Sequence, residues 1–335
     1  MERNLYSFLI MCTTLNAMKI CVTGGAGFIG SELVRQLVNA DHKVTVLDSL
    51  TYAGNLSNLQ EVESKIEFEM LDINDSERLK KFFFSSKFDL IINCAAETHV
   101  DNSITNPGIF IETNYFGVYN LLEIARSNSI KFLQVSTDEV YGSTENEFFK
   151  EESPFNPSSP YSASKAAAEL LIKSYITTFD LNALIVRCSN NYGPNQYPEK
   201  LIPSFVSNLL AGRKVPVYGN GLNVREWMHV SDCASAIIKA GINGKQGDVF
   251  NISSGFFRTN IEVTLKILDI LGLSDSFIEY VSDRPGHDFR YAIDSTKIRE
   301  NLQWEPKVDF DSGIESTVKW YVSHPEFLVY SKGMA

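Results

Sequence analysis

The sequence predicts an α/β protein built on a doubly wound parallel sheet, with a smaller C-terminal α/β region that binds substrate. From Met18 onward, short apolar runs alternate with amphipathic ones. The apolar runs are nearly continuous, which is typical of parallel strands covered on both faces. After about Asn190, proline and glycine become frequent and the segments become shorter. Strands that alternate with helices indicate the doubly wound sheet, and the change of pattern indicates the second region.

Six strands and four helices are expected before residue 190, in alternation along the chain. The expected strands are 19–24, 42–48, 66–72, 89–96, 131–136 and 182–187. The expected helices are 31–40, 76–84, 109–127 and 164–176. Residues 18–190 are therefore assigned to the main domain, and residues 191–335 to a smaller region that is intertwined with it.

Residues 1–17 are expected to be a leader outside the fold, because a βα unit starts directly at Met18. A signal peptide is the alternative for the apolar run from Leu5 to Met11. The only early basic residue, Arg3, is however offset by Glu2. We therefore favour Met18 as the start of the folded chain.

Composition argues against several classes of function. The 335 residues include 30 Lys and Arg against 41 Asp and Glu, a net charge of −11, which disfavours nucleic acid as a partner. No apolar run approaches the roughly 20 residues of a membrane helix. The five cysteines form no CxxC pair, which favours a reducing compartment and a cytoplasmic protein. The five histidines show no metal-binding spacing, so no metal is expected.

The segment from Thr23 to Gly30 reads TGGAGFIG and joins the first expected strand to the first helix. Its glycines let the backbone approach a pyrophosphate, which the N–H groups and dipole of a helix N-terminus attract. Asp48 ends the next strand, 18 residues after Gly30, where a carboxylate can bind the ribose diol and repel a 2′-phosphate. A turn needed only for packing is the alternative. The three features together indicate a Rossmann fold that binds NAD in preference to NADP.

Two further strand ends are candidates for cofactor contacts. Asp72 ends the third strand, where its carboxylate can bind the adenine amine or, equally well, cap the next helix. Ala95 and Ala96 end the fourth strand, where small side chains leave room for the cofactor.

Tyr161 and Lys165 stand four residues apart at the start of an expected helix, in the segment YSASK. This spacing places both side chains on one face. The ammonium group and the helix N-terminus are expected to stabilise a tyrosinate and so lower the tyrosine pKa. A phenolate beside a nicotinamide can take the proton of an alcohol as hydride leaves. The YxxxK pattern alone is weak evidence for this chemistry. Downstream of a dinucleotide-binding turn it is strong evidence.

Thr137, Asp138 and Glu139 follow the fifth strand at its carboxyl end, where open α/β sheets place their chemistry. The Thr137 hydroxyl can hydrogen-bond a reacting oxygen. Two neighbouring carboxyls whose surroundings separate their pKa values can serve as one acid and one base. A solvated acidic turn is the alternative. Because hydride transfer alone needs no such pair, the pair points to a second reaction.

From Met18 to about Glu326 the chain resembles the extended short-chain dehydrogenase/reductase family and, within it, the dTDP-glucose 4,6-dehydratase family. Five segments carry this resemblance: TGGAGFIG, LDSLTYAGNL, VSTDEVYG with YSASK, NNYGPNQYPEKLIP and DRPGHDFRYAID. The glycine-rich segment and the YxxxK pattern are common to the whole family. The Asp-Glu pair and the TYAGNL and DRPGHDFRY loops are typical of a much narrower group within it. The leader before Met18 is the main departure.

The resemblance implies an NAD-dependent hydro-lyase of nucleotide-sugar and deoxysugar metabolism. It would convert dTDP-glucose into dTDP-4-keto-6-deoxy-glucose, with hydride leaving C4 and returning to C6. Tyr161, tuned by Lys165, would be the base at the C4 hydroxyl, and Thr137 would hold the C4 oxygen. Asp138 would protonate the departing C6 hydroxyl, and Glu139 would remove the C5 proton.

The resemblance also implies which positions line the cleft. On the cofactor side these are Gly24, Gly27, Phe28, Ile29, Gly30, Asp48, Ser49, Thr51, Asp72, Ile73, Ala95, Ala96, Thr113, Tyr161, Lys165 and Asn191. On the substrate side they are Thr98, Thr137, Asn190, Lys200, Leu201, Pro216, Tyr218, Arg225, Asn260, Arg284 and His287. The roles of His99 and Asp101, near the cleft mouth, are left open.

Other interpretations stay open at this point. A 4,6-dehydratase of UDP- or CDP-sugars, a nucleotide-sugar 4-epimerase and a decarboxylase use the same scaffold, although an epimerase has no use for an adjacent acid and base. An NAD-sensing protein without turnover would be natural only if Tyr161 or Lys165 were absent. The resemblance further implies a homodimer formed through helices near 109–127 and 161–178.

Overall fold

The computed structural model describes residues 17–283 and 288–328. The predicted leader, apart from Ala17, lies outside the described residues, as do the predicted substrate residues Arg284 and His287. The division of the chain near residue 190 stays a prediction. None of the helices in these two ranges is both long and apolar enough to cross a membrane.

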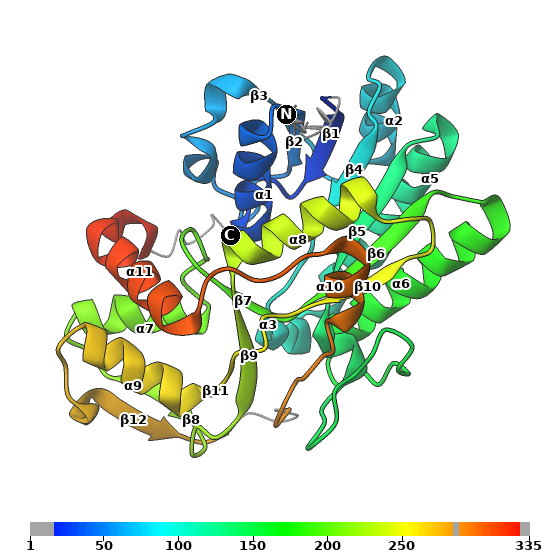
Figure 1. The fold of residues 1–335 in the computed structure, drawn as a ribbon. Coiled ribbons are helices and arrows are strands. Elements are labelled where there is room, and N and C mark those ends of the chain that lie inside the picture. The colour runs from blue at the N-terminus through cyan, green and yellow to red at the C-terminus, as the bar shows by residue number, and fades with distance from the viewer. Residues whose placement is uncertain (1–16, 284–287, 329–335) are drawn as a thin grey trace, which may run out of the picture.

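A seven-stranded, fully parallel sheet forms the centre of the protein (Figure 1). In sheet order the strands are β10 (Val249–Ile252), β6 (Ala183–Cys188), β5 (Lys131–Thr137), β4 (Leu90–Asn93), β1 (Lys19–Thr23), β2 (Lys43–Asp48) and β3 (Ile66–Met70). The direction of winding reverses between β1 and β4, so the predicted doubly wound fold is confirmed. The seventh strand, β10, was not predicted. It comes from the C-terminal part of the chain and pairs with β6.

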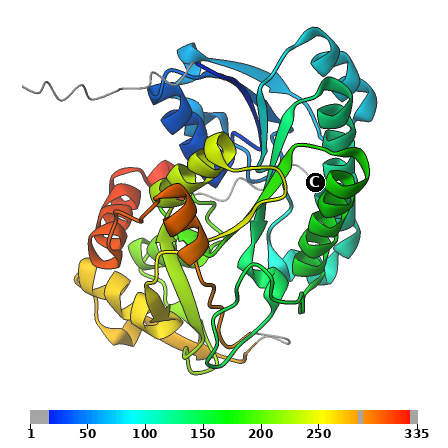
Figure 2. The same cartoon turned by 45° about the vertical axis from the view of Figure 1, so that its right-hand side comes forward.

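Helices cover both faces of this sheet (Figures 1 and 2). One face carries α1 (Phe28–Asn39), α8 (Val230–Asn243) and α10 (Thr296–Leu302). The other carries α2 (Ser76–Ser85), α5 (Val118–Asn128) and α6 (Pro160–Phe179). Each face has its own buried apolar cluster, because the side chains of the inner strands meet a helix whichever way they point. This explains why the strand sequences are continuously apolar.

The expected helix over 109–127 is divided in the structure. It consists of the end of α4 (Pro107–Ile111), a six-residue π-helical segment (Glu112–Gly117) and α5, and it is preceded by a short helix, α3 (Val100–Thr105). Such π-helical segments are frequent at functional sites. Here the Asn114 side chain accepts a hydrogen bond from Glu97 N at 2.9 Å and donates one to Glu97 O at 3.0 Å. The π-helical segment thereby fixes the loop that follows β4.

The second region continues from the carboxyl end of β6 and lies at the lower left of Figure 1. Its strands form two small sheets and are β7 (Asn190–Tyr192), β8 (Val215–Tyr218), β9 (Val224–His229), β11 (Phe257–Thr259) and β12 (Ile278–Val281). Its helices are α7 (Leu201–Leu210), α9 (Asn260–Ile270) and α11 (Phe310–Ser323). Together they bury a third apolar cluster, separate from the two at the main sheet.

Helix α6 carries the YSASK segment and is fixed at two points. At its start, Ser159 and Ser162 form a capping box. In its middle, the fully buried Glu169 pairs with Arg187 of β6 at 2.6 Å. Glu169 also accepts a hydrogen bond from Ser136 Oγ at 2.6 Å. The helix is therefore held against β5 and β6 immediately behind the turn that follows β5.

Candidate active site

Three adjoining cavities lie at the carboxyl edge of the main sheet. We name them the Asp48 cavity (about 220 Å³), the Tyr161 cavity (about 190 Å³) and the Arg225 cavity (about 300 Å³). Ala96 lines both of the first two, and Lys200 lines both of the last two. The three cavities therefore form one continuous cleft, from the end of β2 to the second region.

The glycine-rich turn between β1 and α1 is closed to larger side chains. Gly24 has a φ of +67°, and a Cβ at this position would lie 2.6 Å from Ala95 N. A Cβ at Gly30 would lie 2.1 Å from Gly24 O. These positions need glycine because the turn packs backbone against backbone, which leaves the start of α1 open to a ligand.

The Asp48 carboxylate is anchored to this turn. Its Oδ2 accepts a hydrogen bond from Ala26 N at 2.9 Å, and its Oδ1 accepts one from Leu50 N at 2.8 Å. Burial raises the pKa of Asp48, and the two N–H donors oppose that shift. Asp72 lies exposed in the same cavity, and its Oδ1 accepts from Asn74 N at 2.8 Å. The alternative that Asp72 caps the next helix is wrong, because Asp75 caps α2.

Most of the predicted cofactor residues meet in the first two cavities. The Asp48 cavity is lined by Gly24, Gly27, Asp48, Ser49, Thr51, Asp72, Ile73, Ala95, Ala96 and Thr113. The Tyr161 cavity adds Phe28, Ile29, Gly30, Tyr161 and Lys165. Asn191 lines none of the three cavities. Its Nδ2 donates to Ser189 O at 2.9 Å, and its buried Oδ1 has no partner within the described part of the chain.

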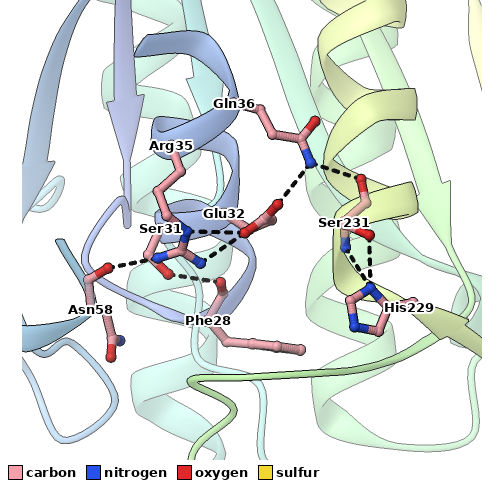
Figure 3. Close-up of polar contacts among 8 residues, drawn as sticks. All are labelled: Phe28, Ser31, Glu32, Arg35, Gln36, Asn58, His229 and Ser231. Carbon is pink, nitrogen blue, oxygen red and sulfur yellow. Dashed lines mark hydrogen bonds and ion pairs between the residues drawn. The ribbon is translucent and has the colours of Figure 1, made fainter. Parts of the chain in front are cut away.

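A polar network on α1 connects the glycine-rich turn with the start of α8 (Figure 3). Glu32 accepts hydrogen bonds from Arg35 and from Gln36, each at 2.8 Å. Gln36 also donates to Ser231 O, at the start of α8, at 2.9 Å. Arg35 donates to Asn58 O at 2.8 Å, and the Asn58 side chain donates to a carbonyl of the glycine-rich turn. These contacts fix the helix N-terminus that faces the cleft.

Tyr161 and Lys165 line the Tyr161 cavity together, from one face of α6. The expectation of a lowered tyrosine pKa is wrong for this structure. Burial, with the charge of Glu139, raises the pKa of Tyr161. Lys165 Nζ donates to Val135 O at 2.7 Å, and burial lowers the pKa of Lys165 to about 8. The protein by itself therefore holds Tyr161 as a neutral phenol.

The turn after β5 gives its two carboxyls different surroundings. Thr137 Oγ1 donates to Asp138 Oδ1 at 3.2 Å and accepts from Glu139 N at 3.2 Å. Asp138 is 3% exposed, and its Oδ2 has no hydrogen-bond partner among the described residues. Burial and the charges of Glu139 and Glu226 raise the pKa of Asp138 well above its usual value. Glu139, in contrast, lines the open Arg225 cavity. The arrangement suits a protonated acid beside a base.

The Arg225 cavity lies between the loop after β4 and the second region. Eight predicted substrate residues line it, namely Thr98, Asn190, Lys200, Leu201, Pro216, Tyr218, Arg225 and Asn260. His99 and Asp101, whose roles were left open, line the same cavity. Burial lowers the pKa of His99, so this side chain presents a neutral imidazole to the cavity at neutral pH.

Some cleft residues were missed by the sequence analysis. Glu199 lines both the Tyr161 and the Arg225 cavity, and Tyr52 donates a hydrogen bond to it at 3.4 Å across the cleft. Glu97 lines the Asp48 cavity, and Tyr291 lines the Arg225 cavity. Three of these four lie in segments that carry the family resemblance. The contact between Tyr52 and Glu199 joins residues 147 positions apart, which no local spacing reveals.

Comparison with known proteins places this cleft in a family. The family model described as GDP-mannose 4,6 dehydratase matches residues 21–317. A dTDP-glucose 4,6-dehydratase of Escherichia coli is 43% identical over 344 residues, covering 92% of this chain and 95% of the relative. Another, of Streptomyces antibioticus, is 45% identical over 312 residues, covering 91% and 92%. The chain belongs to the dTDP-glucose 4,6-dehydratase family.

Solved structures place the dehydratase family within a wider group of the same fold. The family member DesIV of Streptomyces venezuelae, solved with NAD and dTDP bound, has a TM-score of 0.90 and 44% identity, covering 92% of this chain and 98% of its own. A UDP-glucose 4-epimerase of Thermotoga maritima has a TM-score of 0.87 and 30% identity, covering 92% and 100%. The fold is thus shared by dehydratases and epimerases, and the side chains of the cleft must distinguish them.

Proposed function

We propose that the protein is a dTDP-glucose 4,6-dehydratase, which uses NAD to convert dTDP-glucose into dTDP-4-keto-6-deoxy-glucose and water. The observation that carries the proposal is the buried Asp138 beside Glu139, next to Tyr161 and the Arg225 cavity. Oxidation alone needs only the tyrosine base. An adjacent acid and base fit an elimination of water in the same site.

The residues of the cleft fit NAD. The turn formed by Gly24, Gly27 and Gly30 leaves the start of α1 open to a pyrophosphate. Asp48 presents a carboxylate to its cavity, where it can accept hydrogen bonds from a ribose diol and repel a 2′-phosphate. When bound, NAD takes a hydride from the sugar and gives it back within one turnover, so that it is not consumed.

Tyr161 acts as the base in the oxidation at C4. As the phenolate, it takes the proton of the C4 hydroxyl as hydride leaves the same carbon. Because burial disfavours the tyrosinate, positive charge beside the phenol is needed. Lys165, which lines the same cavity, supplies it. Thr137, which hydrogen-bonds Tyr161, is placed to hold the C4 oxygen.

Asp138 and Glu139 carry out the elimination of water. The ketone at C4 acidifies the C5 proton, which Glu139 removes. Asp138 donates its proton to the C6 oxygen, the C6–O bond breaks, and water leaves as the C5–C6 double bond forms. Hydride then adds to C6, and Glu139 returns a proton to C5. Glu139 thereby regains its starting state, and the proton that Tyr161 took from the C4 hydroxyl must pass to Asp138 before the next turnover.

Incubation with dTDP-glucose tests the proposal. Mass spectrometry is expected to show a product lighter by one water, without net consumption of NAD. UDP- and CDP-glucose, offered at the same concentration, are expected to react more slowly. An isomer of unchanged mass would indicate a 4-epimerase, and unreacted substrate would indicate NAD binding without turnover. Either result contradicts the proposal.

We also propose that the protein is a homodimer. Large apolar side chains are exposed along the helices named for this contact, including Phe116 at 53%, Leu170 at 56% and Phe179 at 49%. Such a patch is typical of an interface between subunits. Light scattering is expected to give twice the chain mass, and Leu170→Glu is expected to weaken the dimer. A monomer at micromolar concentration would refute it.

We further propose a cytoplasmic location. The described cysteines Cys21, Cys94, Cys188 and Cys233 form no disulfide, and three of them are buried. Thiols of this kind persist in a reducing compartment. Cell fractionation tests this, and recovery from an oxidising compartment would contradict it.

A further inference from the structure

One buried carboxyl beside the site has no part in the mechanism above. Glu226 lies on β9, next to Arg225, and is 1% exposed. Its Oε1 accepts a hydrogen bond from Gly255 N at 2.5 Å. Its buried Oε2 has no hydrogen-bond partner among the described residues. A carboxyl in such a position costs free energy, so its presence calls for a reason.

Glu226 lies close to Asp138 at the edge of the main sheet. Asp138 directly follows β5, whose last residue is paired with Cys188 of β6, and Cys188 is paired in turn with Ile252 of β10. Gly255, which donates to Glu226, follows β10 by three residues. The ends of three adjacent strands therefore bring the two carboxyls together, and the charge of Glu226 raises the pKa of Asp138.

The surroundings of Glu226 act on its charge in both directions. Burial raises the pKa of Glu226 to about 7, against the opposing effects of the Gly255 N–H, the Ser253 hydroxyl and the guanidinium groups of Arg299 and Arg290. Arg299 belongs to α10, and Arg290 to the segment before it. Near neutral pH this carboxyl is therefore present in both its charged and its neutral form, and the charged form prevails above about pH 7.

The surroundings of Asp138 favour its neutral form. The titratable and charged groups that face it are Glu139 on the same turn, Glu226 and Arg225 on β9, Tyr161 on α6 and Cys188 on β6. Burial raises the pKa of Asp138 most, both carboxylates raise it further, and the Thr137 hydroxyl and Arg225 oppose these effects. Burial keeps the tyrosine uncharged, and the hydrogen bond with Cys233 together with burial keeps the Cys188 thiol uncharged. Negative charge thus dominates on this side.

We propose that Glu226 is a positioning residue of the dehydration: its carboxylate keeps the proton on Asp138, so that Asp138 enters each turnover as the acid. The inference rests on the proposed function, in which Asp138 protonates the departing C6 hydroxyl. Two neighbouring carboxyls in a buried site do not both ionise readily. The charge stays on Glu226 because the N–H donor and two arginines lie on its side.

Glu226→Gln tests this, because glutamine keeps the shape and the acceptor for Gly255 N–H but carries no charge. In single turnovers with dTDP-glucose, the elimination rate is expected to fall at high pH as Asp138 loses its proton. This fall, the alkaline limb of the pH–rate profile, is expected to lie about one pH unit lower in the variant. Oxidation at C4, which depends on Tyr161, serves as the internal reference. Reduced cofactor is therefore expected to accumulate at alkaline pH in this variant more than in the wild type. A merely structural role would slow both steps at every pH.

Three further variants make the test specific. Glu226→Asp, which keeps the charge, is expected to restore the limb toward its wild-type position. In an Asp138→Asn background, Glu226→Gln is expected to shift nothing more, because no acid is left to tune. Arg299→Gln, which weakens the charge on Glu226 from a half-buried site, is expected to give a smaller shift of the same sign. It decides the question if Glu226→Gln does not fold.

The outcomes separate this inference from the proposed function. Wild-type enzyme that leaves dTDP-glucose unchanged overturns the function, and the inference with it. Wild-type enzyme that releases water, with the same alkaline limb in Glu226→Gln, overturns the inference alone. A shift that persists in the Asp138→Asn background also overturns it, because Glu226 would then act through another group.

Discussion

The two regions of the molecule carry their site residues on different kinds of structure. In the first region, the reacting groups stand at the carboxyl end of β5 and at the start of α6, both held by the main sheet. In the second, Asn190, Arg225 and Asn260 lie on short strands and at a helix start. Chemistry is thus placed by one strand and one turn, whereas substrate binding depends on segments that meet only after folding.

The largest expected effect tests whether the first region carries the chemistry. Glu139→Gln keeps the shape of the base but cannot take the C5 proton, so kcat is expected to fall about 10²–10⁴-fold. Oxidation at C4 should still occur. Stopped-flow absorbance is therefore expected to show reduced cofactor that builds up on the enzyme, and exchange of the C5 proton with deuterated solvent should fall in parallel.

A matched variant in the second region sharpens the comparison. Asn260→Ala, in the Arg225 cavity, is expected to raise KM for dTDP-glucose with little change in kcat, because it removes a cavity side chain that takes no part in the proton transfers. If Glu139→Gln exchanged C5 and released water at wild-type rates, Glu139 would be removed from the mechanism. If it formed no reduced cofactor, its role would move to the first step.

The next effect is on stability, and it contrasts an ion pair in each region. Arg187 and Glu169 are fully buried and pair at 2.6 Å. Arg187→Met leaves a carboxylate buried without its partner, so the free energy of unfolding is expected to fall by about 3–5 kcal/mol. Lys266 and Asp311, in the second region, pair at 3.0 Å on the surface, and Lys266→Met is expected to cost much less, because water and salt screen an exposed pair. Urea unfolding of both variants measures the difference, and equal losses would refute it.

A third effect concerns cofactor retention at the edge of the first region. Asp48→Ala removes the carboxylate that faces the Asp48 cavity, together with its bonds to Ala26 and Leu50. NAD affinity is expected to fall by about 1.5–3 kcal/mol, the range for hydrogen bonds to a charged group. Discrimination against NADP is expected to relax as the repulsive charge disappears. Calorimetric titration with both cofactors checks this, and purified variant that still carries stoichiometric NAD would count against it.

The same contrast explains what could be predicted from sequence. The glycine-rich turn and the pair Tyr161 and Lys165 were found because each depends on a fixed local spacing. Strand β10 was not, because its four residues become a strand only by pairing with β6. The carboxyl of Glu226 was missed for a similar reason. Its burial and its proximity to Asp138 arise from packing between strands distant in sequence.

The smallest expected effect is a pH dependence at the contact between the regions. His229 caps α8 by accepting a hydrogen bond from Ser231 N, beside the α1 network of Figure 3. Burial lowers the pKa of His229 below its ordinary value of 6.5. The unfolded chain therefore takes up a proton at a higher pH than the folded protein does. Stability is expected to be complete above about pH 6.5 and to decrease as pH falls toward the lower, folded-state pKa.

His229→Asn isolates this contribution, because asparagine retains an acceptor for the helix cap but does not titrate. Thermal unfolding between about pH 5 and 8 is expected to show a shallower loss of stability in the variant than in the wild type. Part of the slope should remain, since burial also lowers the pKa values of His42 and His99 in the first region. An unchanged slope would mean that the folded protein protonates His229 as readily as the unfolded chain. The junction between β9 and α8 would then be open to water, and the two regions would be less tightly joined than the half-buried cap indicates.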